Sequence, residues 1–182
     1  MGGSWGVPEG FETSVVPLVE TIDQITEQVL AIEEEIEKAT AEEAPTLRRL
    51  MGIPGIGRLT ASAFMALVED PSRFRRTSEI AAYLGLAPWV SESAGKRREA
   101  GITKRGNRAT RSLLIQAAWA HVRSRKDSAL KRWFHRLAGR VGRKKAITAV
   151  ARKLGELMWT MWRKGTSYTA FPPSSRRSAV PT

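Results

Sequence analysis

The sequence predicts an all-α protein, in which an acidic coiled-coil-like helix precedes a compact, basic helical domain. Apolar residues recur at spacings of three and four over residues 12–39 and in several later segments. Residues 1–43 hold 11 acidic residues and one lysine, whereas residues 44–182 carry a net charge of +22. No segment shows the apolar–polar alternation that is typical of a strand. We therefore expect helices throughout, in two regions of opposite charge.

Four segments follow from composition. We expect a flexible, glycine-rich lead-in at 1–11, the acidic helix within 12–43, the basic domain at 44–165 and a disordered tail at 166–182. The chain has no cysteine, which excludes disulfides and thiolate metal sites. It has no apolar run of about 18 residues, so no membrane span is expected. The N-terminus lacks the basic and apolar regions of a signal peptide, which predicts a cytoplasmic protein.

The first helix carries a seam of apolar residues with heptad spacing. Its flanks are acidic, so two parallel copies would repel one another. The seam therefore pairs antiparallel or faces a basic partner, and an oligomerisation or docking helix is favoured over one packed on the core. The seam consists of Val15, Leu18, Ile22, Ile25, Val29, Ile32 and Ile36.

The segment LMGIPGIGRLTA, residues 50–61, separates two short helices expected at 46–51 and 58–68. Gly55 and Gly57 permit a tight turn, because glycine adopts positive φ without a steric penalty. An exposed helix N-terminus after such a turn attracts phosphate. The pattern is that of a helix-hairpin-helix that grips a nucleic-acid backbone, and an ordinary glycine turn between core helices is the alternative. Leu47, Leu50, Leu59, Phe64, Met65 and Leu67 are the expected core residues here.

Further helices are expected from about residue 78 to Gly85, and at 108–123, 128–138 and 143–164. Between them, residues 86–107 show no clear period and read as a long irregular loop. The tryptophans at 119, 133, 159 and 162 are expected in the core or at helix contacts. His121 and His135 lie in basic helical contexts and are expected at the surface or in a groove, not as metal ligands.

The loop from Gly85 to Arg111 is where chemistry is expected. A dense set of cations surrounds the polar cluster Ser91-Glu92-Ser93, and Asn107 stands where it caps the next helix. Cations of this density clamp phosphates, and a serine beside a clamped phosphate can attack phosphorus to form a phosphoserine link. The predicted cations are Lys96, Arg97, Arg98, Lys104, Arg105, Arg108 and Arg111.

Several blocks in a fixed order resemble the C-terminal domain of the IS110 and IS1111 families of insertion-sequence transposases, whose relatives include the Piv invertase and the bridge-RNA-guided recombinases. The resemblance covers about residues 45–165, and the acidic helix is similar to the coiled-coil linker of that family. The blocks are LMGIPGIG, DPSRF (70–74), AAYLGLAPW (81–89), ESAGK (92–96), GITKRGN (101–107) and the pattern R..LL..AAW (111–119).

The resemblance implies a serine nucleophile in this loop, within a Ser-Gly step. Ser93 is the best match, although Ala94 stands where glycine is usual and Gly95 follows one place later. Ser91 therefore remains the second candidate. The family also carries an N-terminal RuvC-like domain with four acidic residues that hold magnesium. That domain is not in this sequence, so no metal ligand is assigned here and magnesium is expected only with the missing domain.

Two functions from different classes remain open, beside a third, a structural RNA-binding protein. The first is the DNA-recombining domain of a transposase, which exchanges strands through the serine and is incomplete without a RuvC-like partner. The second is a non-catalytic module for nucleic-acid binding and dimerisation. The expected partners are DNA and either a second copy or a full-length transposase protomer, and the resemblance leaves a guide RNA open. The positive charge of residues 44–182 agrees with a polyanionic partner in both cases.

Overall fold

The computed structural model describes residues 11–39, 44–93 and 96–171, and the chain divides into two units, Met1–Ala41 and Glu42–Thr182. The first unit contains one helix, α1 (Phe11–Ala39), which includes Pro17 in its interior. The expected helix at 12–39 is therefore present. Most of its apolar seam is exposed, with 63% of Leu18 and 61% of Ile22 accessible to solvent, and Val15 and Ile36 are half-buried.

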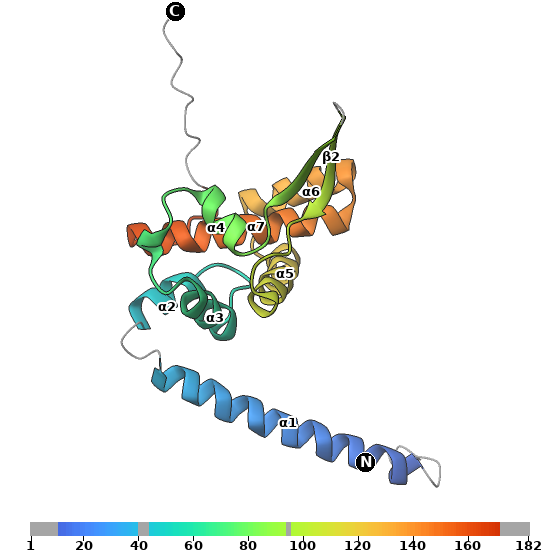
Figure 1. Ribbon diagram of the computed structural model, residues 1–182. Helices are drawn as coiled ribbons and strands as arrows, with labels where there is room; N and C mark the ends of the chain where they lie inside the picture. Colours follow the sequence, from blue (N-terminus) through green and yellow to red (C-terminus); the bar gives the residue numbers. More distant parts are fainter. Residues whose placement is uncertain (1–10, 40–43, 94–95, 172–182) are drawn as a thin grey trace, which may run out of the picture. The chain divides into compact units, whose positions relative to one another are not determined.

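The described part of the second unit contains six α-helices, a short 3-10 turn and one β-hairpin (Figure 1). The all-α fold class is confirmed, and the helices expected at 58–68, 108–123 and 143–164 have those bounds. The elements are α2 (Ala44–Met51), α3 (Arg58–Val68), η1 (Pro71–Arg73), α4 (Thr77–Tyr83), β1 (Pro88–Ser93), β2 (Lys96–Ile102), α5 (Arg108–Arg123), α6 (Ala129–Val141) and α7 (Arg143–Lys164).

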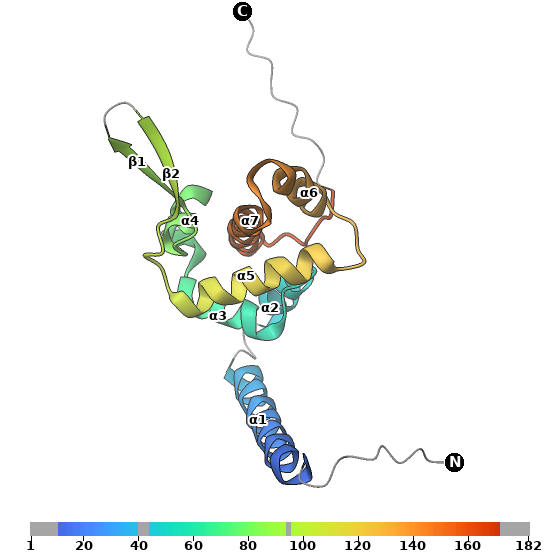
Figure 2. The ribbon, with the colours of Figure 1, turned by 90° about the vertical axis from the view of Figure 1, so that its right-hand side faces the viewer.

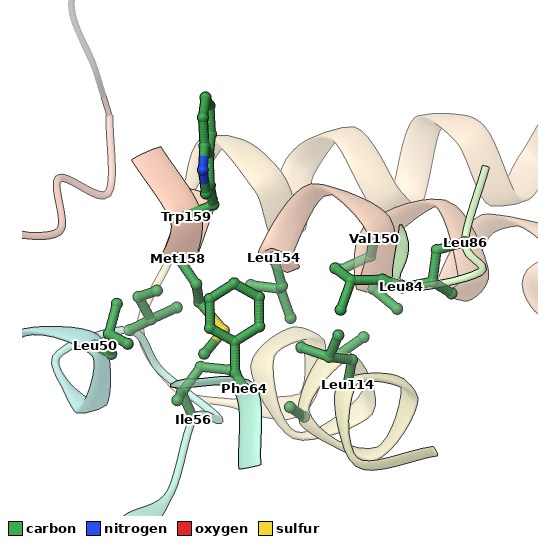
Figure 3. Close-up of a cluster of buried hydrophobic side chains, with 14 of the residues drawn as sticks. Leu50, Ile56, Phe64, Leu84, Leu86, Leu114, Val150, Leu154, Met158 and Trp159 are labelled. Atoms are coloured by element: carbon green, nitrogen blue, oxygen red, sulfur yellow. The ribbon is translucent and has the colours of Figure 1, made fainter. Parts of the chain in front are cut away.

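The core of the second unit forms around α7, which packs against α2, α4, α5, α6 and η1. Val150, Leu154 and Met158 are fully buried along its inner face, and Phe64 of α3 reaches the same cluster (Figure 3). Burying each of these side chains contributes about 1.5–3 kcal/mol to folding. Trp159 is buried, and its Nε1 donates to the carbonyl of Pro71 at 2.9 Å. Trp119, Trp133 and Trp162 pack against the core, so all four tryptophans expected in the core or at helix contacts are found there.

Three expectations about single segments differ from the structure. Leu59, expected in the core, is 48% exposed in the first turn of α3, because this helix buries Ala61, Phe64 and other residues instead. Residues 166–171 were expected in a disordered tail, yet Tyr168 packs against the core and the Ala129 amide donates to the Ala170 carbonyl at 2.9 Å. The rest of the tail and most of the expected lead-in lie outside the described residues.

The expected irregular loop at 86–107 contains the antiparallel hairpin formed by β1 and β2. The pairing has an irregularity between Pro88 and Val90, where the register shifts. Figure 2 shows the hairpin extending from the end of α4, apart from α6 and α7. The prediction that the chain has no strands is thus wrong for this segment. Cross-strand pairing, which local periodicity does not report, forms it.

Candidate nucleic-acid interface

The turn between α2 and α3 is held by two buried isoleucines. The Ile56 amide donates to the Ile53 carbonyl at 3.0 Å, and both side chains are at most 5% exposed. Gly55 has φ +90°, and a Cβ added there would lie 2.5 Å from the Ala117 carbonyl oxygen and 2.6 Å from the backbone nitrogen of His121. Gly55 therefore lets the turn lie directly on the backbone of α5. Its role is in the fold.

Gly57 is in a different situation. It is the N-cap of α3, has an ordinary extended backbone with φ −93° and ψ 176°, and makes no side-chain cap hydrogen bond. A Cβ added at Gly57 would meet nothing within 4 Å. Neither backbone conformation nor packing thus requires glycine here. Its small size leaves the first amides of α3 accessible to a ligand that approaches closely.

His121 anchors the same turn from α5. Its side chain is 1% exposed, so the expectation that it lies at the surface or in a groove is wrong. Nδ1 lies 2.8 Å from the Pro54 carbonyl oxygen, which can only accept, so Nδ1 carries the proton. Nε2 therefore accepts from the Ser128 hydroxyl at 2.9 Å. Burial lowers the pKa of His121, the bond to Pro54 opposes this, and the Lys131 charge lowers it further.

Ser128 extends this connection to α6. Its hydroxyl oxygen accepts from the Lys131 amide at 3.0 Å and so caps the first turn of α6. A single buried network thus joins the α2–α3 turn, α5 and the start of α6. His135, by contrast, is exposed on α6 as expected.

The hairpin register fixes which residues of the polar cluster share a face. Ser93 pairs with Lys96, Ser91 with Arg98, and Glu92 with Arg97. Directly paired residues belong to one face of a sheet, and successive residues of a strand belong to opposite faces. Both candidate serines therefore share a face with Lys96 and Arg98, and Glu92 and Arg97 are assigned to the other. Glu92, although adjacent in sequence, is not on the serine face.

The segment after β2 is fastened to the end of α4. The Thr103 amide donates to Ala87 at 3.0 Å, and the Lys104 amide to Gly85 at 3.2 Å. A Cβ at Gly106 would lie 2.2 Å from the Tyr83 carbonyl oxygen, so only glycine permits this approach. These contacts fix the base of the hairpin relative to α5.

Arg111 and Asn107 hold the same segment from α5. Arg111 Nη1 donates to the carbonyls of Lys104 at 3.3 Å and Gly106 at 3.0 Å. The Asn107 side chain accepts from the Thr110 amide at 3.0 Å, which makes Asn107 the N-cap expected from the sequence. The guanidinium of Arg111 is thus engaged in holding the loop.

Three predicted phosphate-binding side chains lie at the surface, near Asn107 and Arg111. Lys104, Arg105 and Arg108 are exposed, and Lys104 has a positive φ of 55°, which is unusual for a residue with a side chain. Arg108 begins α5, whereas Gly55 contacts α5 at Ala117 and His121. At 1.5 Å per residue, these points lie about 14 to 20 Å apart along the helix. The candidate interface therefore has two parts joined by α5.

An open pocket of about 560 Å³ lies beside the loop and was not predicted from the sequence. The rings of Phe74 and Tyr83 are 5.2 Å apart, and the Tyr83 hydroxyl donates to the Leu67 carbonyl at 3.2 Å. No sequence pattern brings these residues together with the loop. The pocket is lined by Leu67, Phe74, Glu79, Ala82, Tyr83, Arg105, Gly106 and Asn107.

Among the described residues, no three His, Asp or Glu side chains are grouped to hold a metal ion, and no helix is long and apolar enough to span a membrane. The chain's own described residues therefore do not form the four-carboxylate magnesium site that the family resemblance implies for the RuvC-like domain.

Residues 47–135 match the family described as "Transposase IS116/IS110/IS902 family". Residues 47–135 thus match the transposase domain of this family, which bears out the resemblance at this level.

Curated relatives agree with this assignment. The chain is 36% identical over 138 residues to the "Transposase for insertion sequence element IS1111A" of Coxiella burnetii, covering 75% of this chain and 38% of the relative. It is 31% identical over 153 residues to a "Probable family 20 transposase" of Pseudomonas aeruginosa, covering 83% and 45%. It is 28% identical over 162 residues to the "Insertion element IS110 uncharacterized 43.6 kDa protein" of Streptomyces coelicolor, covering 88% and 39%. The chain thus spans less than half the length of these relatives.

Proposed function

We propose that this chain is the DNA-binding, strand-exchanging part of a transposase, with Ser93 as the nucleophile and Ser91 as the alternative. It acts in DNA transposition as one component of the active site. The RuvC-like domain of a full-length protomer supplies the rest, including any magnesium. The net charge of +22 over residues 44–182 of this chain is typical of a nucleic-acid-binding domain.

The observation that carries the proposal is the register of the hairpin. Ser93 is paired with Lys96 and Ser91 with Arg98, so each serine is directly opposite a cationic residue. Lys104, Arg105 and Arg108 are exposed where the hairpin leads into α5. A serine paired in register with a cationic residue and followed by further cations is suited to a phosphodiester, because cations neutralise the phosphate and the charge that develops during its transfer.

The proposed step conserves the number of phosphoester bonds. The serine Oγ attacks phosphorus and loses its proton as the O–P bond forms, while the bond from phosphorus to one sugar oxygen breaks. That oxygen takes up a proton and leaves as a hydroxyl. Attack by a hydroxyl of another strand then reverses the sequence and rejoins the DNA without an external energy source.

Gly57 and the start of α3 supply a second contact to the sugar–phosphate backbone. The amides at the N-terminus of α3 have no side-chain cap, and no side chain at Gly57 limits access to them. Backbone amides carry no information about base identity, so this contact is expected to be independent of sequence. It positions the DNA for the hairpin and does not select the target.

The alternative function is a non-catalytic module that binds nucleic acid and self-associates. The exposed apolar face of α1 favours this candidate, because such faces mark sites of association. Both candidates share the same DNA contacts. The test that separates them is whether a serine becomes covalently attached to DNA.

A trapping experiment separates them. The chain is mixed with a full-length transposase protomer and labelled DNA spanning the ends of its insertion sequence, and protein–DNA adducts are resolved on a denaturing gel. We expect an adduct with the wild type and none with Ser93→Ala. Loss with Ser91→Ala alone would transfer the role to Ser91. An adduct that survives in the double variant would refute serine catalysis, and duplex binding without any adduct would support the alternative.

The two glycines of the α2–α3 turn give a test of DNA binding. Gly57→Val is expected to leave the Tm close to that of the wild type but to weaken binding to every duplex alike. Gly55→Val is expected to destabilise the fold, because its side chain would collide with α5. Thermal unfolding and fluorescence anisotropy with two duplexes of unrelated sequence measure both effects. Unchanged binding by a folded Gly57→Val protein would remove this contact from the proposal.

A further inference from the structure

Residues 128–155 form the most uniformly basic part of the chain. They contain nine lysines and arginines and no aspartate or glutamate. They cover α6, the connection at Gly142 and the first half of α7. None of these cations belongs to the hairpin or to the loop before α5. These cations are therefore separate from the ones that the proposed function uses.

The exposed cations of this region gather where α6 meets α7. Arg136 and Arg140 lie one turn apart on the exposed side of α6, about 6 Å along the helix. Lys144 and Lys145 are exposed in the first turn of α7, directly after the connection. We call Arg136, Gly139, Arg140, Lys144 and Lys145 the α6–α7 corner. Figures 1 and 2 show these two helices joined at one end of the helical unit.

Neighbouring cations are engaged within the fold, in contrast to those of the corner. Arg132 is paired with Asp127, with its Nε 2.8 Å from Oδ2. Arg143 lies over the ring of Trp119, 5.7 Å from its centroid. Across the described part of the chain, the four cations of the corner form no ion pair. The corner thus concentrates charge that the folded chain does not neutralise.

Gly139 is an independent observation on the same surface. It lies inside α6, where glycine is about 1 kcal/mol less favourable than alanine. It is exposed between Arg136 and Arg140, and a Cβ added there would meet nothing within 4 Å. Neither packing nor a positive φ requires this glycine. Its small size does allow an external surface to approach the helix closely between two arginines.

We infer that the α6–α7 corner is a second DNA-binding surface, which holds the phosphate backbone of a duplex separately from the hairpin. This inference rests on the proposed function, since both assume a DNA partner. Single strands are bound largely by stacking on exposed aromatic rings. Residues 136–145, which hold the whole corner, contain no phenylalanine, tyrosine or tryptophan. Cations without a stacking surface match the backbone of a duplex.

A set of charge variants in the full chain tests the surface. Binding to a short fluorescein-labelled duplex is followed by anisotropy over a series of salt concentrations. Arg136→Gln with Arg140→Gln should weaken binding at least tenfold at low salt and reduce the slope of log K against log salt by about 1.8. Lys164→Gln is the matched control, on the same helix about 30 Å from Lys144. It should leave both quantities unchanged.

Gly139→Leu separates a binding role from a structural one. Leucine favours helix and the position is open, so the Tm should stay the same or rise. The affinity for the duplex should nevertheless fall several-fold, because the side chain holds the DNA away from α6. Wild-type affinity in a folded Gly139→Leu protein, together with wild-type affinity in the double arginine variant, would overturn the inference.

The outcomes keep the two proposals apart. If the corner variants bind normally while Gly57→Val and Arg108→Gln weaken binding, the corner is excluded and the proposed function stands. If the wild type binds no duplex, the proposed function fails as well. If the corner variants lose only the ability to bind a structured RNA competitor, the surface belongs to RNA and the inference for DNA is wrong.

Discussion

α1 and α7 are two long helices with the same kind of apolar pattern and opposite environments. In α7, Val150, Leu154 and Met158 are 0% exposed. In α1, Leu18 and Ile22 are 63% and 61% exposed. The three-and-four spacing predicted both helices, yet it carries no information about what covers the apolar face. An amphipathic pattern thus predicts that a partner surface exists, and the location of that partner is a separate question.

The contrast separates two sources of stability. The face of α7 is buried by α5, α6 and α4 within its own unit, so it contributes to the free energy of unfolding of that unit. An exposed helix with no covered face gains little stability from its own hydrogen bonds. The seam of α1 is therefore expected to gain its stabilisation through association with another copy or another segment, as its heptad spacing predicts.

Truncating one residue in each helix gives the largest expected effect. Leu154→Ala should lower the free energy of unfolding of the helical unit by about 2–5 kcal/mol, because it leaves a cavity in a fully buried site. Ile25→Ala on α1 should change it by less than about 0.5 kcal/mol, since Ile25 is 53% exposed. Urea unfolding followed by tryptophan fluorescence measures both. Equal losses would show that the two faces are buried alike and would end the comparison.

Self-association of the full chain gives the next effect. Ile22→Asn with Ile25→Asn places two polar side chains in the seam and should weaken association at least tenfold, without changing the Tm of the helical unit. Sedimentation at several protein concentrations gives the association constant. Val16→Asn, outside the seam but 50% exposed, is the matched control and should associate normally. A wild-type chain that stays monomeric at high concentration would rule out the oligomeric role of α1.

The helices could be predicted well where local pattern determines them. The bounds of α3, α5 and α7 agree with the sequence because apolar spacing, Asn107 as a cap and Gly165 as a stop act within a few residues. The hairpin was missed because residues 88–102 are rich in charge and lack alternation. Its strands exist through pairing with one another.

The candidate site was only partly predictable for the same reason. The sequence indicated the loop serines, the cations around them and the glycine turn. It did not indicate which glycine the fold requires, since that depends on the approach of Gly55 to α5. It also missed the burial of His121, whose bond to Pro54 joins residues 67 positions apart in the sequence. Contacts between distant segments are not encoded in local periodicity.

The smallest expected effect is a pH dependence of stability. It sharpens the comparison between α1 and the helical unit, because both histidines of the chain lie in the helical unit. Burial lowers the pKa of His121 from its ordinary value of 6.5, so the unfolded chain binds a proton that the folded chain does not. The stabilisation is present in full above about pH 6.5 and is lost as the pH falls below it, toward the lowered pKa of the folded state. The Tm of the helical unit should therefore fall between pH 7.5 and pH 5.5.

His121→Gln identifies the source of that fall. The variant is expected to be less stable at pH 7.5, because it disturbs the bonds to Pro54 and Ser128, and to lose part of the pH dependence. His135→Gln is the control, and this variant should leave the pH dependence intact because His135 is exposed and outside the buried network. Protonated His121 would need Nε2 to donate to Ser128, so the Ser128 hydroxyl would have to turn its own hydrogen away from Nε2 and lose that acceptor. If both variants kept the wild-type pH dependence, the buried network would not be its cause, and the acid sensitivity of the helical unit would have to come from its carboxylates.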